Sequence, residues 1–116
     1  MTLSDLAEFE EVRSWLKKSG YSGLAQAEQD ALLDDLRAFC EHTGMDPGEM
    51  VASCLAKNAD GLTKISIKGR RQMQAAIDSF VQDRGLEGRE GIVVGNRIRG
   101  FLIHNGVFIQ GRAAVD

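Results

Sequence analysis

The sequence predicts an all-α protein, a compact bundle of about four to five helices, and three observations lead to that class. The chain has 116 residues, which suits one domain with a single modest core. Hydrophobic residues make up 43% of it, an ordinary share for a globular protein and too high for a disordered one. Along most of the chain the apolar residues recur at intervals of three and four, which is the spacing of one helix face.

The first half of the chain is expected to form three helices. The first covers about residues 8–18 and the second about residues 26–43, where Gly44 is placed to end it. Asp46 and Pro47 suit the N-cap and the first position of a third helix that reaches about Lys57. The expected buried stripes are Phe9, Val12, Trp15 and Leu16, then Leu32, Leu33, Leu36, Phe39 and Cys40, then Met50, Val51, Cys54 and Leu55.

The second half is expected to add two helices. A break over residues 58–61, Asn-Ala-Asp-Gly, precedes the fourth, which Thr63 or Ser66 can cap and which reaches about Arg84. Residues 91–105 are compatible with a helix or, because of their β-branched residues, with a strand. We prefer a fifth helix there, since Asn-Gly at its end supplies a left-handed stop, although Gly95 and Gly100 each cost about 1 kcal/mol relative to alanine. The inward stripes are Met73, Ile77, Phe80 and Val81, then Val94, Ile98, Phe101 and Leu102.

The ends of the chain and its cysteines bear on domain organisation and location. We expect residues 1–110 to form the helical domain and residues 111–116 a tail or the start of an interdomain linker, with the chain extended and loosely packed from Val107. The N-terminus lacks the basic flank and apolar stretch of a signal peptide, and no run of about 18 apolar residues predicts a membrane span. Cys40 and Cys54 are interpreted as reduced core residues, so we expect a cytoplasmic protein.

The sequence contains little that indicates catalysis. It has no HExxH, GxSxG or P-loop, and the cysteines lack a nearby histidine pair that would make a zinc site. His42 and His104 fall in the last turns of expected helices, where such a ring suits the exposed carbonyls. Asp30, Asp34 and Asp35 are interpreted as a solvated acidic face. We therefore expect no enzymatic activity, no cofactor, no metal and no small-molecule substrate.

Charge is distributed unevenly, although the chain as a whole has a net charge of −3. Residues 1–61 contain five Lys and Arg against twelve Asp and Glu, and residues 62–116 contain nine against five. A basic half can be the footprint of a polyanion, because Lys and Arg displace phosphate counterions, or it can be ordinary surface scatter. The candidate DNA-binding residues are Lys64, Lys68, Arg70, Arg71, Arg89, Arg97 and Arg99.

The first four of these residues crowd the expected start of the fourth helix. The helix dipole disfavours cations there, whereas backbone N–H groups and side-chain charge together suit a phosphate. Arg97 and Arg99 add charge on the fifth helix, with Arg89 just before it. The alternative is a solvated basic face with no ligand.

Two stretches of sequence resemble a known family. Residues 32–51, LLDDLRAFCEHTGMDPGEMV, resemble the pattern L-x-x-F-C-x-x-x-G-x-x-P-x-E followed by two apolar residues, which is typical of early helices in integrase core-binding domains. Residues 96–107, NRIRGFLIHNGV, are similar to the closing stretch of those domains. Over roughly residues 9–110 the chain thus resembles the N-terminal core-binding, SAM-like domain of tyrosine recombinases and phage-type integrases.

This resemblance implies a function in DNA integration and recombination. Such domains are helical bundles that close around one side of duplex DNA, while a separate catalytic domain supplies the tyrosine, arginines and histidine that cut a strand. That catalytic domain is absent from this sequence, which has no H-x-x-R and a single tyrosine, Tyr21. The resemblance therefore implies a non-catalytic module that binds duplex DNA mainly through phosphates, with assembly as a homo-oligomer on DNA as a further expectation.

The second expected helix departs from the family pattern. Family members tend to have basic DNA contacts there, whereas this chain has Glu28, Asp30, Asp34 and Asp35. Acidic side chains would repel phosphate, so DNA contact would shift to the helix near Lys64 and to the arginines of the fifth helix. The alternative function is a protein-protein interaction module in which the acidic half binds a basic partner or a second copy and DNA is not bound.

Overall fold

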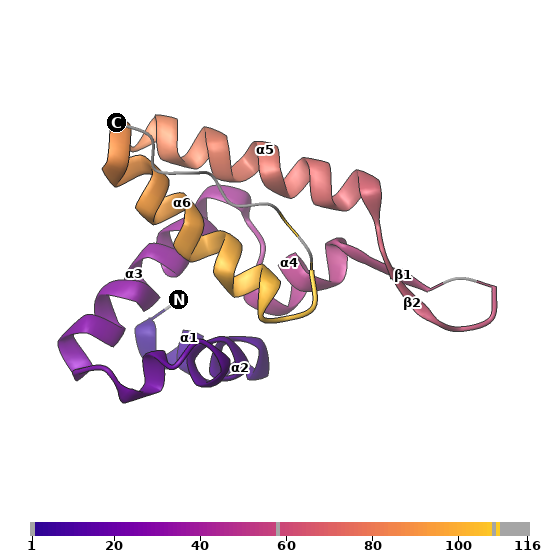
Figure 1. Cartoon of the computed structure of the whole chain (residues 1–116), viewed down its shortest axis with the longest axis horizontal. Coiled ribbons are helices and arrows are strands. Elements are labelled where there is room, and N and C mark those ends of the chain that lie inside the picture. The colour runs from indigo at the N-terminus through magenta and orange to yellow at the C-terminus, as the bar shows by residue number, and fades with distance from the viewer. Residues whose placement is uncertain (1, 58, 108, 110–116) are drawn as a thin grey trace.

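The protein is mostly helical, with one small sheet (Figure 1). The structure is a computed structural model that describes residues 2–57, 59–107 and 109. The elements in chain order are α1 (Leu3–Ala7), α2 (Glu10–Lys18), a 3-10 helix η1 (Tyr21–Gly23), α3 (Gln26–Thr43), α4 (Pro47–Ser53), β1 (Leu55–Lys57), β2 (Thr63–Ile65), α5 (Ile67–Asp83) and α6 (Gly88–Ile103). The expected helical bundle is thus confirmed as a compact, mostly helical fold.

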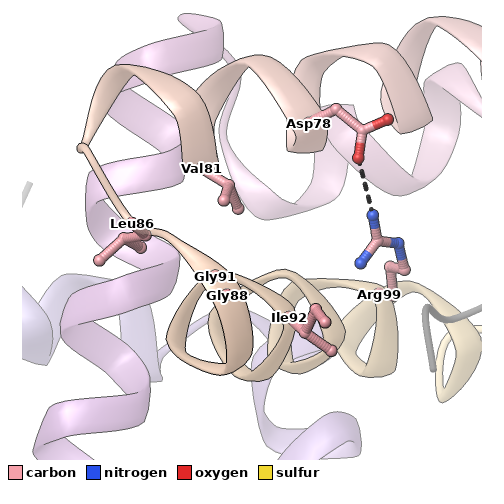
Figure 2. Close-up of a pocket in the computed structure, with 7 residues that line it drawn as sticks. All are labelled: Asp78, Val81, Leu86, Gly88, Gly91, Ile92 and Arg99. Carbon is pink, nitrogen blue, oxygen red and sulfur yellow. Dashed lines mark hydrogen bonds and ion pairs between the residues drawn. The ribbon is translucent and has the colours of Figure 1, made fainter. Parts of the chain in front are cut away.

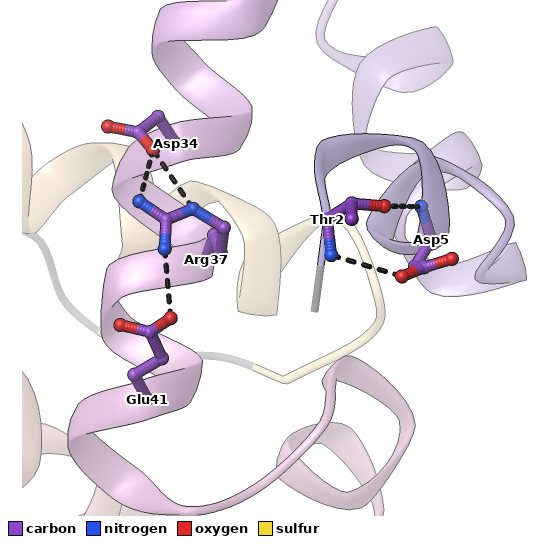
Figure 3. A network of polar contacts seen from close by, with 5 residues as sticks. All are labelled: Thr2, Asp5, Asp34, Arg37 and Glu41. Atoms are coloured by element: carbon purple, nitrogen blue, oxygen red, sulfur yellow. Dashed lines mark hydrogen bonds and ion pairs between the residues drawn. The ribbon is translucent and has the colours of Figure 1, made fainter.

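Local signals in the sequence set several helix boundaries where they were predicted. Asp46 accepts a hydrogen bond from the Glu49 backbone N–H at 2.8 Å, and Glu49 accepts one from the Asp46 N–H, so a capping box begins α4. Thr2 and Asp5 form a second capping box at α1, a helix that was not predicted (Figure 3). Gly44 ends α3 with a φ of 71°, a left-handed conformation that glycine adopts without steric cost.

The region over residues 91–105 is a helix, as preferred, rather than a strand. α6 lies at the centre of the bundle and packs against α2, α3 and α5. Its buried residues include Ile98, Phe101 and Leu102, and Phe101 meets the indole of Trp15 edge to face at 5.8 Å between ring centroids. Gly95 has a packing role that offsets its low helix propensity, because a Cβ there would lie 2.7 Å from Nη1 of Arg99. Tertiary packing therefore decides in favour of the helix.

The all-α prediction missed a β-hairpin between α4 and α5. The third helix was expected to reach about Lys57, but α4 ends at Ser53 and the next residues form β1. β1 pairs antiparallel with β2, and Leu55 lies opposite Ile65 and Ala56 opposite Lys64. Leu55 and Ile65 are half-buried while Ala56 and Lys64 are exposed, so the ribbon turns one face to the bundle. Figure 1 shows the hairpin extending beyond the helices at one end of the molecule.

The chain after α6 departs from the expected loose tail. Val107 and Ile109 are 0% and 3% exposed, so both side chains belong to the core. The expectation that the chain packs loosely from Val107 is therefore wrong at these two positions. The expected tail or linker over residues 111–116 lies outside the described residues.

Candidate nucleic-acid interface

The candidate site is built on the junction where β2 runs into α5. The Ser66 N–H donates to the Cys54 carbonyl at 2.8 Å, and Ser66 Oγ caps α5 by accepting from the Gly69 N–H at 3.1 Å. Gly69 is buried against the end of α4, because a Cβ on it would lie 1.9 Å from the Ser53 carbonyl oxygen. These contacts fix the first turn of α5 and the base of the hairpin to the bundle. Of the two predicted caps for this helix, Ser66 is the one used and Thr63 lies in β2.

Four of the predicted cations lie at this junction, and we call them the basic cluster: Lys64, Lys68, Arg70 and Arg71. Lys64 is on β2 rather than in the helix where it was expected, and it is exposed. Lys68 and Arg71 are exposed at the start of α5, and Arg70 between them is half-buried. Across residues 2–57, 59–107 and 109, no ion pair joins any of the four to a carboxylate. The first turn of α5 also contains no acidic residue.

The position of the basic cluster is electrostatically unfavourable for the protein alone. The N-terminal end of a helix has a partial positive charge, and acidic side chains normally compensate it. Here the cations add to that charge, and none of them forms an ion pair with a described carboxylate. A bound anion would relieve both the mutual repulsion of the cations and their repulsion by the helix end.

One other predicted cation, Arg99, is engaged inside the protein. Arg99 is 2% exposed, and its guanidinium donates to Asp78 at 3.0 Å, to Asn96 at 3.2 Å and to Gln74 at 3.3 Å. Figure 2 shows the Arg99–Asp78 pair bridging α5 and α6. Sequence reasoning placed Arg99 among the DNA-binding candidates, whereas these contacts give it a structural role between the two helices.

The remaining two candidates, Arg97 and Arg89, lie apart from the basic cluster in the chain's last helix. Arg97 donates to Asp35 of α3 at 2.9 Å, and the two side chains are 37% and 16% exposed. Arg89 is exposed in the first turn of α6, the helix that follows the far end of α5. The structure therefore brings together only the four residues of the basic cluster out of the predicted set.

The acidic face of α3 is compensated in part by neighbouring arginines. Arg37 pairs with Asp34 and with Glu41, whose Oε1 lies 2.8 Å from Nη1 (Figure 3). Asp35 pairs with Arg97, and Asp30 accepts a hydrogen bond from Gln26 at 2.8 Å. This face is therefore less available to a basic partner than the sequence alone indicates.

Two concave sites are lined by described residues, and neither suits a catalytic centre. A pocket of about 210 Å³ lies between α5 and α6 (Figure 2). It is lined in part by Arg99, whose guanidinium is already hydrogen-bonded within the protein. A second, of about 340 Å³, lies at the end of α3 and contains Cys40 in its wall. Burial raises the pKa of the Cys40 thiol to about 12, so this group stays protonated and is a poor nucleophile at neutral pH.

Within residues 2–57, 59–107 and 109, no three His, Cys, Asp or Glu side chains gather as metal ligands would. Over the same part of the chain, every helix is too short or too polar to cross a bilayer. Tyr21, the single tyrosine, lies in η1 with its ring edge-on to Trp15 at 5.8 Å.

Sequence reasoning missed two residues next to the basic cluster. Leu62 and Ile67 flank β2 and are 64% and 61% exposed, the highest values among the large hydrophobic residues described. Neither residue belongs to the apolar stripe expected for the fourth helix. That position was the only feature of the sequence to indicate that they are exposed.

Comparison with known proteins does not identify a relative. No protein-family model, no curated protein and no solved structure matches this chain. The resemblance to integrase core-binding domains therefore stays a prediction from the sequence.

Proposed function

We propose that this chain is a non-catalytic module that binds duplex DNA, mainly through phosphate contacts made by the basic cluster. The observation that supports the proposal best is the gathering of Lys64, Lys68, Arg70 and Arg71 at one end of the molecule without an ion pair to any described carboxylate. Lys and Arg placed in this way gain by displacing counterions from a polyanion.

An extended polyanion suits the basic cluster better than a single small anion. The chain path from Lys64 to Arg71 spans at most about 16 Å, given the rise per residue of a strand and of a helix. One phosphate group is too small to contact cations spread over such a path, whereas a duplex offers a row of phosphates.

The finer parts of the proposal come from the sequence. The role would be that of the SAM-like core-binding domain of a tyrosine recombinase or integrase, with strand cleavage supplied by another domain. A cytoplasmic location and assembly on DNA as a homo-oligomer belong to the same proposal. The free, buried Cys40 and Cys54 are compatible with a reducing compartment.

Fluorescence anisotropy with a labelled duplex tests the proposal. We expect a dissociation constant in the micromolar range at low salt, and a plot of log K against log salt with a slope of about −3.6 if all four cations contact phosphates. Absence of binding at tens of micromolar protein, about the weak end of non-specific affinity, would contradict the proposal.

Charge reversal shows whether the basic cluster is responsible. The double variant Arg70→Glu/Arg71→Glu is expected to weaken DNA binding by at least about tenfold, because two phosphate contacts are lost and repulsion is added. The matched control is Arg13→Glu/Lys17→Glu, which changes the net charge equally on the exposed face of α2. Equal loss in both pairs would mean that only net charge matters and would contradict the assignment to the basic cluster.

The alternative function, a protein-protein interaction module, predicts the opposite pattern. A partner that binds the acidic α3 would tolerate Arg70→Glu/Arg71→Glu and would be lost in variants of Asp30 and Glu28. The internal pairing of Asp34 and Asp35 weakens this alternative. We therefore retain DNA binding as the proposed function.

A further inference from the structure

Two aliphatic side chains next to the basic cluster are exposed to solvent, Leu62 in the hairpin and Ile67 at the start of α5. Leu62 is 64% exposed and Ile67 is 61% exposed, whereas the other three exposed large hydrophobic residues described lie between 37% and 43%. In the chain Lys64 falls between Leu62 and Ile67, and Lys68 follows directly. Exposed aliphatic groups of this size gain free energy when another molecule buries them.

The geometry of the hairpin makes it a projecting and anchored element. Leu55 and Ile65 turn toward the bundle, which leaves Lys64 and Ala56 on the outer face. The ribbon extends past the helices in Figure 1, and the hydrogen bond from the Ser66 N–H to the Cys54 carbonyl fixes its base. An element that projects from a fixed base can enter a groove of a larger molecule.

Charge distinguishes among the molecules that could cover these side chains. A second copy joined symmetrically through this surface would bring two basic clusters together, which like-charge repulsion disfavours. A membrane-binding helix needs a broad apolar face, but beyond its first turn the exposed positions of α5 include Gln72, Ser79 and Gln82. Duplex DNA offers both phosphates for the cations and stacked bases between which an aliphatic side chain can insert.

Resting on the proposed DNA binding, we infer that the hairpin is a wedge that enters the minor groove and bends the duplex. Leu62 and Ile67 are the aliphatic side chains placed against or between base pairs, and the basic cluster holds the flanking phosphates. Insertion of aliphatic side chains partly unstacks a base step and kinks DNA toward the major groove. The chain therefore prefers DNA that is already easy to unstack.

Energy transfer between dyes at the two ends of a duplex of about 30 base pairs measures the bending. The wild-type chain is expected to bring the dye-labelled ends closer. It should also bind a duplex with a central mismatch about tenfold more tightly than the fully paired one, because the mismatch has already lost stacking.

The test variant is Leu62→Ala/Ile67→Ala, and the control is Leu24→Ala/Ile103→Ala. The control also truncates two exposed aliphatic side chains, but at other places in the fold. Leu24 follows η1 and is 37% exposed, and Ile103 is the last residue of α6 and is 43% exposed. The test variant is expected to lose the bending and to reduce the mismatch preference to about twofold or less, while it keeps the salt dependence of binding to paired DNA. The control should behave as the wild type does.

The outcomes separate this inference from the proposed function. Salt-dependent binding without bending or mismatch preference would overturn the wedge and leave the proposed DNA binding intact. Absence of any duplex binding would overturn both. Binding of the wild type to anionic phosphatidylserine vesicles that the test variant loses, with no distortion of DNA, would assign the hairpin to a membrane and overturn the inference. Bending that persists in the test variant would also overturn it.

Discussion

Arg71 and Arg99 are on neighbouring helices and have the same side chain, but their surroundings are opposite. Arg71 is exposed near the start of α5, and among the described residues it pairs with no carboxylate. Arg99 is buried in the middle of the α5–α6 contact, where it donates to side chains of both helices. Arg99 donates its hydrogen bonds within the fold, whereas Arg71 forms no ion pair with a described carboxylate. Positive charge therefore indicates a binding surface only where the neighbours leave it uncompensated.

A buried glycine accompanies each of the two arginine sites. Gly95 leaves room for the guanidinium of Arg99, since a Cβ would lie 2.7 Å from Nη1. Gly69 leaves room for the backbone of α4, with a Cβ only 1.9 Å from the Ser53 carbonyl oxygen. At the first site the glycine makes space for a flexible side chain, and at the second for rigid backbone. An added methyl group is therefore expected to destabilise the protein more at Gly69 than at Gly95.

The largest effect is expected for Gly69→Ala. Because the added methyl group would overlap a backbone carbonyl, α5 must shift away from α4, and we expect a loss of about 3 kcal/mol or more of unfolding free energy. Urea denaturation followed by circular dichroism measures it. The matched control is Gly100→Ala, also in a helix, whose Cβ would meet only Trp15 Nε1 at 3.8 Å and should stabilise by about 0.5–1 kcal/mol. Equal stability of both variants would show that the junction is not tightly packed.

The next effect contrasts the two arginines directly. Arg99→Met is expected to cost about 2–3 kcal/mol of unfolding free energy, because two hydrogen bonds from α6 to α5 and one within α6 are lost. Arg71→Met, on the surface, should change it by less than about 0.5 kcal/mol. The same urea titrations compare the two. Similar values for both variants would contradict the division into a structural and a free arginine.

Most of the fold was predictable because its signals are local. Asp46-Pro47 marks the start of α4 and Gly44 the end of α3, each through backbone chemistry that a few residues determine. The hairpin was missed because each strand has three residues, too few for an alternating pattern to show. Leu55 also fits the apolar stripe of a longer third helix, and only its pairing with Ile65 places it in a strand.

The site was predictable only in part, because burial depends on residues far apart in the chain. Sequence reasoning could group Lys68 with Arg71, which are near each other along the chain. It could not separate them from Arg99, since that distinction requires Asp78 and Gln74, more than twenty positions away, to pack beside it. The exposure of Leu62 and Ile67 likewise became visible only once the hairpin was placed.

Neutralising two cations of the basic cluster tests whether its exposed side chains contact DNA phosphates. The double variant Lys68→Gln/Arg71→Gln is expected to make the slope of log K against log salt less steep by about 1.8, since two phosphate contacts are removed. Anisotropy titrations over about 50 to 200 mM salt measure this slope. The stability should hardly change, because both side chains are exposed. An unchanged slope would place the DNA contacts elsewhere.

The smallest effect on DNA binding is expected for Arg97→Gln, whose effect on stability should lie between those of Arg71→Met and Arg99→Met. Arg97 is 37% exposed and pairs with Asp35, so it is neither buried like Arg99 nor unpaired like Arg71. A half-exposed ion pair is screened by water, and we expect a loss of about 0.5–1 kcal/mol in urea denaturation. The salt slope of DNA binding should stay that of the wild type, because the Asp35 carboxylate already neutralises this guanidinium. A slope less steep by about 0.9 would instead show that Arg97 exchanges Asp35 for a phosphate when DNA binds. Arg99 would then be the one arginine of the three compared whose role is purely structural.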